Sequence, residues 1–587
     1  MLRSDLLLGL VVVFSLTATA ARADITLVEN GVCGYSIVVA PDASPADRRG
    51  AGELQSFILQ MSGAKLPIVD SAAQAKAPGQ VIVVGAGAPL EALGVKLPQN
   101  LGEDGFVIGT TGRQLYIAGT GRRGTMYGCT ALLEDLGVRF YTPSVTSIPE
   151  RKTITLASID RTEIPAFEYR DSFFTEAFDK DWAAHLRING HATHLDDSTG
   201  GKIVFYPFVH SFDLLIPPSE FQKHPEYFPL IDGKRTGGYV QRCLSNPDVL
   251  RIAKQRVRQW IQENPRVKLI DVSQNDVGKW CTCDQCTAIA NRYGGVQSGL
   301  YLWFVNQIAE DIEKDYPDKL IETLAYQFTE AAPTGIEPRP NVRIRLCPIS
   351  CCEAHPYEKC SEQTNKDFLK ALAAWDAMTD SLYIWHYNIN FRHYLMPFPD
   401  FDEFPAEARL YKRSGVKGVF FQGGYAPGGG ASDAELRSYV MARLLWDVNV
   451  DTDALVTQWM QGVYGPAARP MRAWFDLLHE KARDPSAHFR IFDDVNVPYL
   501  TDDVLAQGQI LFDQAQHLAV GYPTAARYVK KARLGLRYVN LMKHPRVDQE
   551  FRNFLADARA FGITQFREGR PIDQWEEKYI QAHSRKP

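Results

Sequence analysis

The stretch Leu269-Ile270-Asp271-Val272-Ser273-Gln274-Asn275-Asp276 decides how the rest of the chain is interpreted. A short apolar run that ends in adjacent amide and carboxyl groups is typical of a buried strand with polar chemistry at its C-terminal end. In a (β/α)8 barrel that end is where catalytic side chains lie, because the loops that follow the strands form the active face. The stretch therefore predicts a barrel with Asn275 and Asp276 at its active face.

Repeated strand-then-helix units extend on both sides of this stretch, over residues 160–432, and such alternation indicates a parallel α/β architecture. Eight strands, most of them followed by a helix, favour a closed (β/α)8 TIM barrel; an open, doubly wound sheet is the alternative. The second and third strands are closely spaced. The expected strands are residues 167–174, 192–195, 202–210, 269–273, 320–328, 342–348, 382–388 and 415–422, and the expected helices are 181–188, 247–263, 299–314 and 366–378.

Two further parts flank this barrel. Residues 24–155 alternate strand and helix signals over a length usual for one small α/β domain. Residues 433–587 form a helical region, because five segments in it have apolar residues at amphipathic helical spacing. We expect this C-terminal region to act as scaffold and the barrel to hold the chemistry.

Residues 1–23 have the pattern of a secretory signal. Arg3 supplies the positive start, residues 6–16 form an apolar stretch, and Ala21-Arg22-Ala23 matches an A-x-A-type cleavage site. The apolar stretch is too short for a comfortable membrane span, and no later segment reaches that length. We therefore expect a secreted or periplasmic protein whose mature chain begins near Asp24, with a retained N-terminal anchor as the alternative.

Composition and charge exclude some classes of partner. The 587 residues are 45% hydrophobic and 23% charged, which is ordinary for a globular protein. The 64 basic and 69 acidic residues are interspersed, with a formal net charge of -5, so no basic stripe indicates nucleic acid. The glycine-rich segment 119–124 lacks the Lys-Ser/Thr pair of a nucleotide-binding loop, and we expect a tight turn there and no cofactor. The oligomeric state stays open.

The ten cysteines allow three interpretations. Disulfides are the default in an exported protein. The C-x-C-x-x-C spacing at residues 281–286 can also bind structural zinc with a fourth ligand from elsewhere, and free thiols are the third possibility. A catalytic metal is not expected, because no His-rich open site is visible near the cysteines. Seven cysteines form two clusters, which are Cys281, Cys283 and Cys286, and Cys347, Cys351, Cys352 and Cys360.

Polar and aromatic side chains gather at the predicted strand ends, without a Ser or Cys nucleophile elbow. Carboxylates, amides and aromatic faces together suit carbohydrate chemistry, because glycosidic hydrolysis needs an acid to protonate the leaving oxygen and a second group to stabilise the oxocarbenium-like centre. The candidate site residues are Arg170, His210, Asn275, Asp276, Tyr326, Glu330, Trp385, His386, Tyr387 and Gln422.

Asp276 is the candidate general acid, because the apolar strand behind it and Trp280 beyond it would desolvate the carboxyl and raise its pKa. If the acetamido group of the substrate acts as the nucleophile, Asn275 would orient that group; in a conventional mechanism Glu330 would be the second carboxylate. A structural alternative is that Asn275 and Asp276 only form a turn at a strand end.

The remaining candidates would bind the sugar. Arg170 and His210 would hold its hydroxyl groups, and Trp385 and Tyr387 would stack on its ring or donate hydrogen bonds. Each also has a structural interpretation. His210 is more often a hydrogen-bonded structural histidine, as is His386, and the two aromatic residues can simply fill a layer of the barrel.

Several segments resemble known families. Ala51-Gly52-Glu53-Leu54-Gln55-Ser56-Phe57, residues 119–128 and Leu136-Gly137-Val138-Arg139-Phe140-Tyr141 resemble the α-glucuronidase-type N-terminal domain. His224-Pro225-Glu226-Tyr227-Phe228, with residues 232–235, 273–286 and 439–446, resembles the bacterial family described as domain of unknown function 4838, which is associated with glycoside hydrolase family 163. The resemblance implies a retaining, substrate-assisted endo-β-N-acetylglucosaminidase that acts on a glycan or glycoprotein.

Two other functions stay open beside this one. An α-glucuronidase-like exo-hydrolase would need basic residues such as Arg170 and Arg392 around a uronate carboxylate. A catalytically silent glycan-binding protein would use the same pocket without cleaving its ligand. The same fold hosts many chemistries, so the side chains of the site must discriminate among the three.

Overall fold

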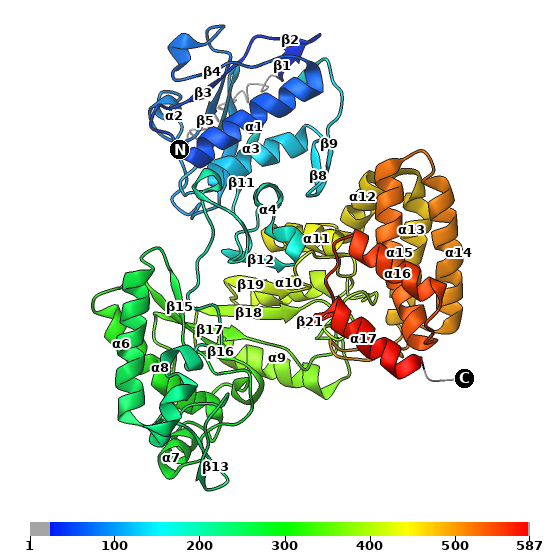
Figure 1. Ribbon diagram of the computed structural model, residues 1–587. Coiled ribbons are helices and arrows are strands. Elements are labelled where there is room, and N and C mark those ends of the chain that lie inside the picture. Colours follow the sequence, from blue (N-terminus) through cyan, green and yellow to red (C-terminus); the bar gives the residue numbers. More distant parts are fainter. Residues whose placement is uncertain (1–23, 585–587) are drawn as a thin grey trace, which may run out of the picture.

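The structure is a computed structural model that describes residues 24–584. The predicted signal at residues 1–23 lies outside the described residues. No helix in the described part of the chain is long and apolar enough to span a membrane. A central parallel sheet adjoins two other parts: an N-terminal α/β part, drawn in blue above it, and a C-terminal helical part, drawn in orange and red to its right (Figure 1).

The central sheet has six strands in the order β12-β19-β18-β17-β16-β15, and every neighbouring pair is parallel. Within this sheet, β12 comes first along the chain and β19 comes last, and the two pair with each other, so the sheet curls back on itself. The mixed α/β fold with a curled parallel sheet confirms the predicted fold class. The strands are β12 (Tyr169–Phe173), β15 (Leu269–Asp271), β16 (Leu320–Ala325), β17 (Val342–Leu346), β18 (Leu382–Tyr387) and β19 (Gly418–Gln422).

Irregular chain closes the gap between β12 and β15. The N–H of Asn189 donates to the carbonyl of Arg170 at 3.0 Å, and the N–H of Ile203 donates to the carbonyl of Asn189 at 3.0 Å. Phe205 then forms an isolated parallel bridge with Leu269. Regular strands therefore occupy six of the eight positions of a (β/α)8 barrel, and irregular chain spans the other two.

The strands predicted at residues 192–195 and 202–210 are thus wrong as regular strands. Only the single-turn η3 (Asp197–Thr199) lies between these segments, in place of the crossover helix that connects regular parallel strands. Loops and turns carry the chain through both segments, and the bridge at Phe205 is the one strand-like residue between 192 and 210.

Helices cover the outside of the sheet, and the apolar spacing predicts all of them except the helix at residues 404–413. In α6, Val249, Ala253, Val257, Trp260 and Ile261 are buried, which is one face of a helix at a period of 3.6 residues. The covering helices are α4 (Lys180–Leu186), α6 (Pro247–Glu263), α8 (Gln297–Glu313), α9 (Gln363–Asp376), α10 (Phe404–Arg413) and α11 (Ala434–Trp446).

The N-terminal part is a six-stranded mixed sheet packed against α1 (Pro45–Ser62) and α3 (Gly124–Asp135). Buried ion pairs join it to the barrel: the guanidinium of Arg170 donates to Asp104 at 2.8 Å, and Arg187 donates to Glu134 at 2.5 Å. The sheet runs β11 (Asp160–Glu163), β6 (Phe106–Thr111), β7 (Gln114–Gly119), β5 (Val81–Val84), β3 (Ser36–Val39) and β4 (Ile68–Val69).

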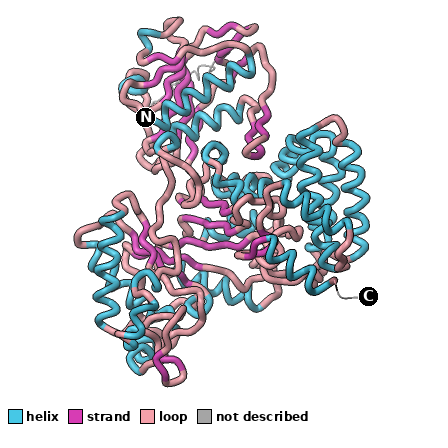
Figure 2. Tube along the Cα trace, viewed as in Figure 1, coloured by secondary structure: helices cyan, strands magenta, loops and turns pink. Residues whose placement is uncertain are grey.

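The C-terminal part is mostly helical (Figure 2). A short hairpin of β20 (Gln565–Arg567) and β21 (Arg570–Pro571) lies against the barrel, because the N–H of Tyr394 donates to the carbonyl of Phe566 at 2.8 Å. The helices are α12 (Thr452–Tyr464), α13 (Ala468–Ala482), α14 (Asp502–Leu518), α15 (Pro523–Lys543), α16 (Gln549–Ala560) and α17 (Ile572–His583).

All ten cysteines lie in the described residues and carry free thiols. The disulfides that export would favour are therefore not formed in this structure, so the cysteines remain as thiols.

Candidate active site

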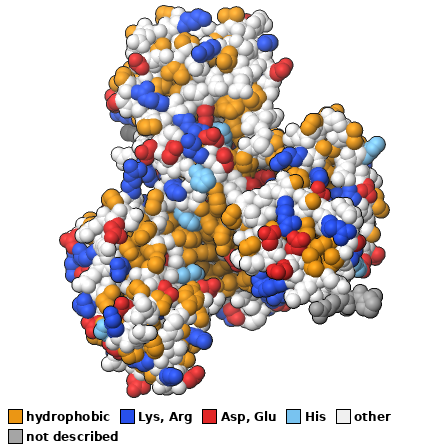
Figure 3. Space-filling model, in the orientation of Figure 1, with side chains coloured by type: hydrophobic (Ala, Val, Ile, Leu, Met, Phe, Trp, Pro, Cys, Tyr) orange, Lys and Arg blue, Asp and Glu red, His pale blue; other side chains and the backbone are white. Residues whose placement is uncertain are grey.

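A cavity of about 340 Å³ opens at the C-terminal ends of the barrel strands. Figure 3 shows a hollow with many hydrophobic side chains between the barrel and the C-terminal helices. The cavity is lined by Phe173, Phe208, Val209, His210, Asp276, Leu324, Tyr326, Cys347, Ile349, Trp385, Tyr387, Phe391, Gln422, Tyr425, Phe492 and Glu568. Six of the ten predicted site residues are in this set, namely His210, Asp276, Tyr326, Trp385, Tyr387 and Gln422.

Asp276 lies in the loop that follows β15 and points its carboxyl into the cavity. The hydroxyl of Tyr326 donates to Oδ1 of Asp276 at 3.0 Å, and the amide of Gln327 donates to that hydroxyl at 2.8 Å. Burial, and then the nearby charge of Asp276, raise the pKa of Tyr326, so this phenol keeps its proton and acts as a donor. Tyr326 and Gln327 together hold the carboxylate in one orientation.

The desolvation expected around Asp276 is not provided. Asp276 is exposed, and the Trp280 ring stacks on Phe328, with 5.0 Å between ring centroids. The physical reason is that burial ends with Asn275: residues 269–275 are buried, and Asp276 is the first exposed residue after β15.

Glu568 is a second carboxyl in the same cavity, contributed by the turn between β20 and β21. Tyr425 donates a hydrogen bond to Oε1 of Glu568 at 3.0 Å, and the amide of Gln422 lies 3.4 Å from the same oxygen. Burial raises the pKa of Glu568; the Tyr425 hydrogen bond lowers it, and the charge of Asp276 raises it. The electrostatic influence of Asp276 on Glu568 follows from their position in one cavity.

Aromatic rings and amides form the rest of the wall. The indole N–H of Trp385 donates to Oε1 of Gln422 at 2.7 Å, which orients the amide that reaches Glu568. Nδ1 of His210 donates to the carbonyl of Gln274 at 2.7 Å, because a carbonyl oxygen can only accept. Phe208 lies 5.6 Å from Trp385, ring centroid to ring centroid. Stacking surfaces and hydrogen-bonding groups thus alternate around the cavity.

A buried ion pair lies below this wall. Arg345 of β17 pairs with Glu322 of β16 at 2.8 Å, and both side chains are fully buried. The guanidinium carbon lies 5.1 Å from the ring centroid of Phe208 and 5.6 Å from that of Trp385. Two of the aromatic rings that line the cavity therefore pack on a cation from below.

Asn275 and Arg170 do not reach the cavity, contrary to their predicted roles. The amide of Asn275 donates to Asp213 at 2.5 Å and to the carbonyl of Val240 at 2.8 Å, so it fastens the loop and faces away from Asp276. Arg170 is fully buried and donates to Asp104. Neighbouring residues on an extended chain point to opposite sides, and these two occupy the outward side.

Glu330 and His386 also lie outside the cavity. Burial, together with the charge of Asp367, raises the pKa of Glu330 to about 7, and its carboxyl is not among the lining groups. His386 is fully buried; its Nδ1 lies 2.8 Å from the Tyr411 hydroxyl, and burial lowers its pKa to about 3. Neither side chain is among the groups that line the cavity, whereas Glu568, which the sequence did not single out, is.

The comparisons with known proteins agree with this architecture. No curated protein matches the chain. A solved family GH115 4-O-methyl-α-glucuronidase, BtGH115A, with specificity for decorated arabinogalactans, has a similar fold (TM-score 0.60, 12% identity, 96% of this chain and 81% of that one covered). So does a solved GH138 enzyme targeting pectin rhamnogalacturonan II (TM-score 0.51, 11% identity, 93% and 72% covered). At these identities the likeness shows the fold alone.

Two family profiles match the sequence itself. The profile described as "Glycosyl hydrolase family 67 N-terminus" matches residues 34–132, where the N-terminal segments resemble the α-glucuronidase-type domain. The profile described as "Domain of unknown function (DUF4838)" matches residues 140–476, which is more than half of the chain and includes the whole barrel. The chain therefore belongs to the DUF4838 family.

Proposed function

We propose that the protein is a glycoside hydrolase that cleaves β-linked N-acetylglucosamine in glycans outside the cytoplasm. The observation that carries the proposal is the pair of carboxyl groups, Asp276 and Glu568, in one aromatic-walled cavity at the C-terminal ends of the barrel strands. Two carboxyl groups in different environments are what glycosidic hydrolysis requires, one to donate a proton and one to act as a carboxylate.

The different surroundings of the two carboxyl groups indicate which one is the general acid and which one is the carboxylate. Glu568 is half-buried and its pKa is raised, so it is the general acid that protonates the leaving oxygen. Asp276 is exposed and accepts the Tyr326 hydrogen bond, so it acts as the carboxylate. This assignment moves the acid role from Asp276, where the sequence alone placed it, to Glu568.

A substrate-assisted mechanism uses the same groups. Asp276 accepts the N–H of the substrate's acetamido group, and the acetamido carbonyl oxygen attacks the anomeric carbon as Glu568 protonates the departing oxygen. Water then opens the cyclic intermediate with Glu568 as the base, and the anomeric configuration is retained. Asp276 here takes over the orienting role that the sequence assigned to Asn275.

The lining groups favour a neutral sugar over a uronate. The cavity contains two acidic residues, and its lining set in the described chain has no Arg or Lys. Arg170 is committed to Asp104, and Arg392 is exposed outside the lining set. A uronate carboxylate would meet like charges without a cation to offset them, which is unfavourable. The cavity lining therefore lacks the cation that an α-glucuronidase would need to bind the uronate carboxylate.

The first experiment incubates wild type, Asp276→Asn and Glu568→Gln with a complex N-glycoprotein and identifies the products by mass spectrometry. We expect wild type alone to release glycans and to leave one N-acetylglucosamine on the protein. Release by Asp276→Asn at the wild-type rate would overturn the assignment of the carboxylate. Glycan binding without cleavage by all three proteins would instead identify a non-catalytic binding protein.

An activated substrate tests the acid role separately. An aryl N-acetylglucosaminide with a strongly acidic phenol as leaving group needs little protonation. We expect Glu568→Gln to lose far less activity on this substrate than on the glycoprotein, and Asp276→Asn to lose activity on both. Equal losses for Glu568→Gln on both substrates would contradict the acid role.

A further inference from the structure

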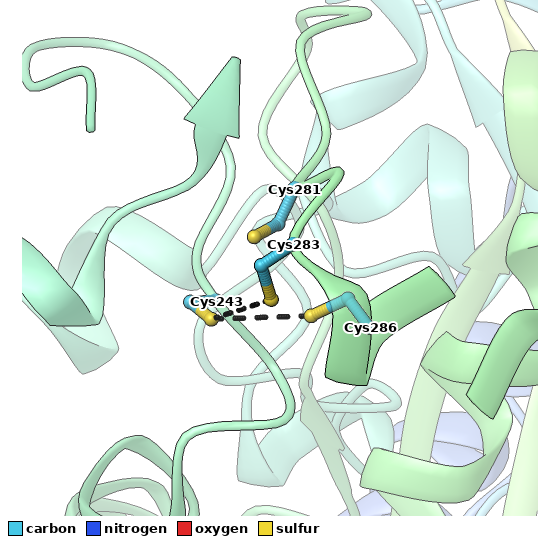
Figure 4. A group of neighbouring side chains, drawn as sticks. All are labelled: Cys243, Cys281, Cys283 and Cys286. Carbon is cyan, nitrogen blue, oxygen red and sulfur yellow. Dashed lines mark hydrogen bonds between the residues drawn. The ribbon is translucent and has the colours of Figure 1, made fainter. Parts of the chain in front are cut away.

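Four cysteine thiols from two separate segments meet near the loop that follows β15 (Figure 4). Cys243 lies before α6, and three more lie at the start of α7 (Asp284–Arg292). The Sγ of Cys243 lies 3.7 Å from that of Cys283 and 3.9 Å from that of Cys286. With Cys281, all four sulfurs lie within 4.8 Å of one another. Cys243 thus adds a fourth thiol, from a distant segment, to the three of the C-x-C-x-x-C segment.

These distances match a tetrahedral metal site. Zinc–sulfur bonds of about 2.3 Å in a tetrahedron place neighbouring sulfurs about 3.8 Å apart. A disulfide would bring two sulfurs to about 2.05 Å and would leave the others without a partner. Three of the four residues are buried, so water does not compete strongly for the centre of the cluster. All-thiolate, four-ligand sites of this closed kind are structural rather than catalytic.

The surroundings suit the negative charge that four thiolates would give a Zn²⁺ site. The N–H of Leu230 donates to Sγ of Cys281 at 3.3 Å, and the guanidinium of Arg235 lies 3.8 Å from the same sulfur. Both come from the hairpin of β13 (Leu230–Ile231) and β14 (Lys234–Arg235), which lies over the cluster. Donors and cations around metal-bound sulfur stabilise the thiolate form.

We propose that this four-thiol cluster binds a structural Zn²⁺ ion that holds the loop carrying Asp276. Gln241, two residues before Cys243, accepts the N–H of Asn275 at 3.1 Å and donates to the Asn275 carbonyl at 2.8 Å. The loop then runs from Asp276 to Cys281, so the ion would join both sides of the segment that aims the carboxylate. Metal binding at this cluster can be measured without any assay of the activity proposed for Asp276.

A second cluster independently has the spacing of a Cys2His2 zinc site. Sγ of Cys352 lies 3.4 Å and Sγ of Cys360 lies 3.9 Å from Nδ1 of His488, near the value of about 3.6 Å that tetrahedral zinc gives between a thiolate and an imidazole. Nε2 of His355 donates to the carbonyl of Asp484 at 3.0 Å, which leaves its Nδ1 free to bind. All four ligand atoms lie within 4.8 Å of one another.

This second site would fasten the C-terminal part to the barrel. Cys352, His355 and Cys360 lie between β17 and α9, whereas His488 follows α13. Phe492, which lines the cavity, is four residues beyond His488. Zn²⁺ at this position therefore positions one wall of the site, as the four-thiol site positions the opposite loop.

Elemental analysis of the full-length protein tests both sites. The protein is purified without a metal-affinity tag from cells grown with added zinc, and zinc is measured by mass spectrometry. We expect about two zinc ions per chain in wild type and one each in Cys286→Ser and Cys360→Ser. The control Cys33→Ser, at a buried cysteine outside both clusters, should keep two.

Cobalt substitution in wild type keeps the test valid if the serine variants do not fold. Co²⁺ at the four-thiol site should give intense thiolate-to-metal absorption, with visible bands distinct from those of a Cys2His2 site. Wild type with no bound zinc, or with an intact mass lowered by two hydrogens for each disulfide within the clusters, would overturn the proposal. Loss of zinc only in Cys286→Ser would overturn the second site and keep the first.

Discussion

At the scale of single residues, the Tyr326 hydroxyl orients the proposed catalytic carboxylate. This hydroxyl donates a hydrogen bond to Asp276 and accepts one from the side-chain amide of Gln327. Tyr326→Phe keeps the ring and removes only this hydrogen bond. We expect kcat/KM to fall about 100-fold, as it does when one preorganised donor is removed from an active site. Steady-state kinetics measures this, with circular dichroism to check the fold. Activity within twofold of wild type would show that Asp276 does not need the phenol.

As the proposed general acid, Glu568 would make the reaction depend on pH. A general acid must be protonated, so activity falls as pH rises through its pKa, which burial raises above the ordinary carboxyl range. Tyr425 lowers that pKa by donating to the carboxylate, so Tyr425→Phe should move the alkaline limb of the kcat/KM profile to higher pH. A limb that stays in place in Tyr425→Phe, or moves to lower pH, would mean that another group titrates.

At the scale of secondary-structure elements, alternation along a strand decides which side chains the cavity receives. Trp385 and Tyr387 of β18 line it, while His386 between them faces α10 and Tyr411. The sequence alone placed all three residues in the site, although successive side chains of a strand point to opposite faces. The alternation of side chains along β18 could therefore have predicted that His386 does not line the same cavity as Trp385 and Tyr387.

Hydrogen bonds of the Asn275 side chain hold the turn after β15 in place. Asn275 bridges Asp213 and the Val240 carbonyl from a buried position. Asn275→Ala should lower the free energy of unfolding by about 1–3 kcal/mol, because buried partners lose their hydrogen bonds. Chemical denaturation measures this loss. A variant of wild-type stability with specific loss of turnover on N-acetylated substrates would instead restore the orienting role first expected of Asn275.

At the scale of the whole molecule, charged contacts join the N-terminal part to the barrel. Asp104 is buried between Arg123 and Arg170, with N···O distances of 2.5 and 2.8 Å. Asp104→Ala would leave two buried guanidinium groups without their partner, and we expect a loss of about 3–5 kcal/mol in stability. Thermal unfolding provides the measurement, and Asp135→Ala, at a more exposed ion pair with Arg161, is the matched control. Equal stability of the two variants would contradict the role of this junction.

The same junction predicts a loss of stability in acid. Burial alone would raise the pKa of Asp104, but Arg123 and Arg170 outweigh it and lower that pKa below the ordinary value. The stabilising contribution is therefore complete above the unfolded pKa of about 3.9 and is lost as pH falls through the lowered folded pKa. The difference between the denaturant midpoints of wild type and Asp104→Ala should be constant from pH 6 to pH 5 and should shrink as the pH falls below about 4. A constant difference between them would show that Asp104 does not titrate in this range.

What the sequence alone determined is mostly local. Apolar periodicity placed six barrel strands and most of the helices that cover them, because strand and helix periods are properties of neighbouring residues. The polar and aromatic residues near the strand ends included six that line the cavity. The family segments around 224–286 and 439–446 lie within the matched region. The two irregular barrel positions were not predictable in this way, because backbone hydrogen bonds of single residues hold them instead of a repeating pattern.

Tertiary structure alone decided the partners that come from far away in the chain. Glu568 reaches the cavity from a hairpin nearly three hundred residues beyond Asp276, and nothing in the residues around it distinguishes it from an ordinary turn carboxylate. Cys243 and His488 complete their clusters in the same way. Long-range packing brings such groups together, and a sequence pattern, which reports only on neighbouring residues, does not contain that information.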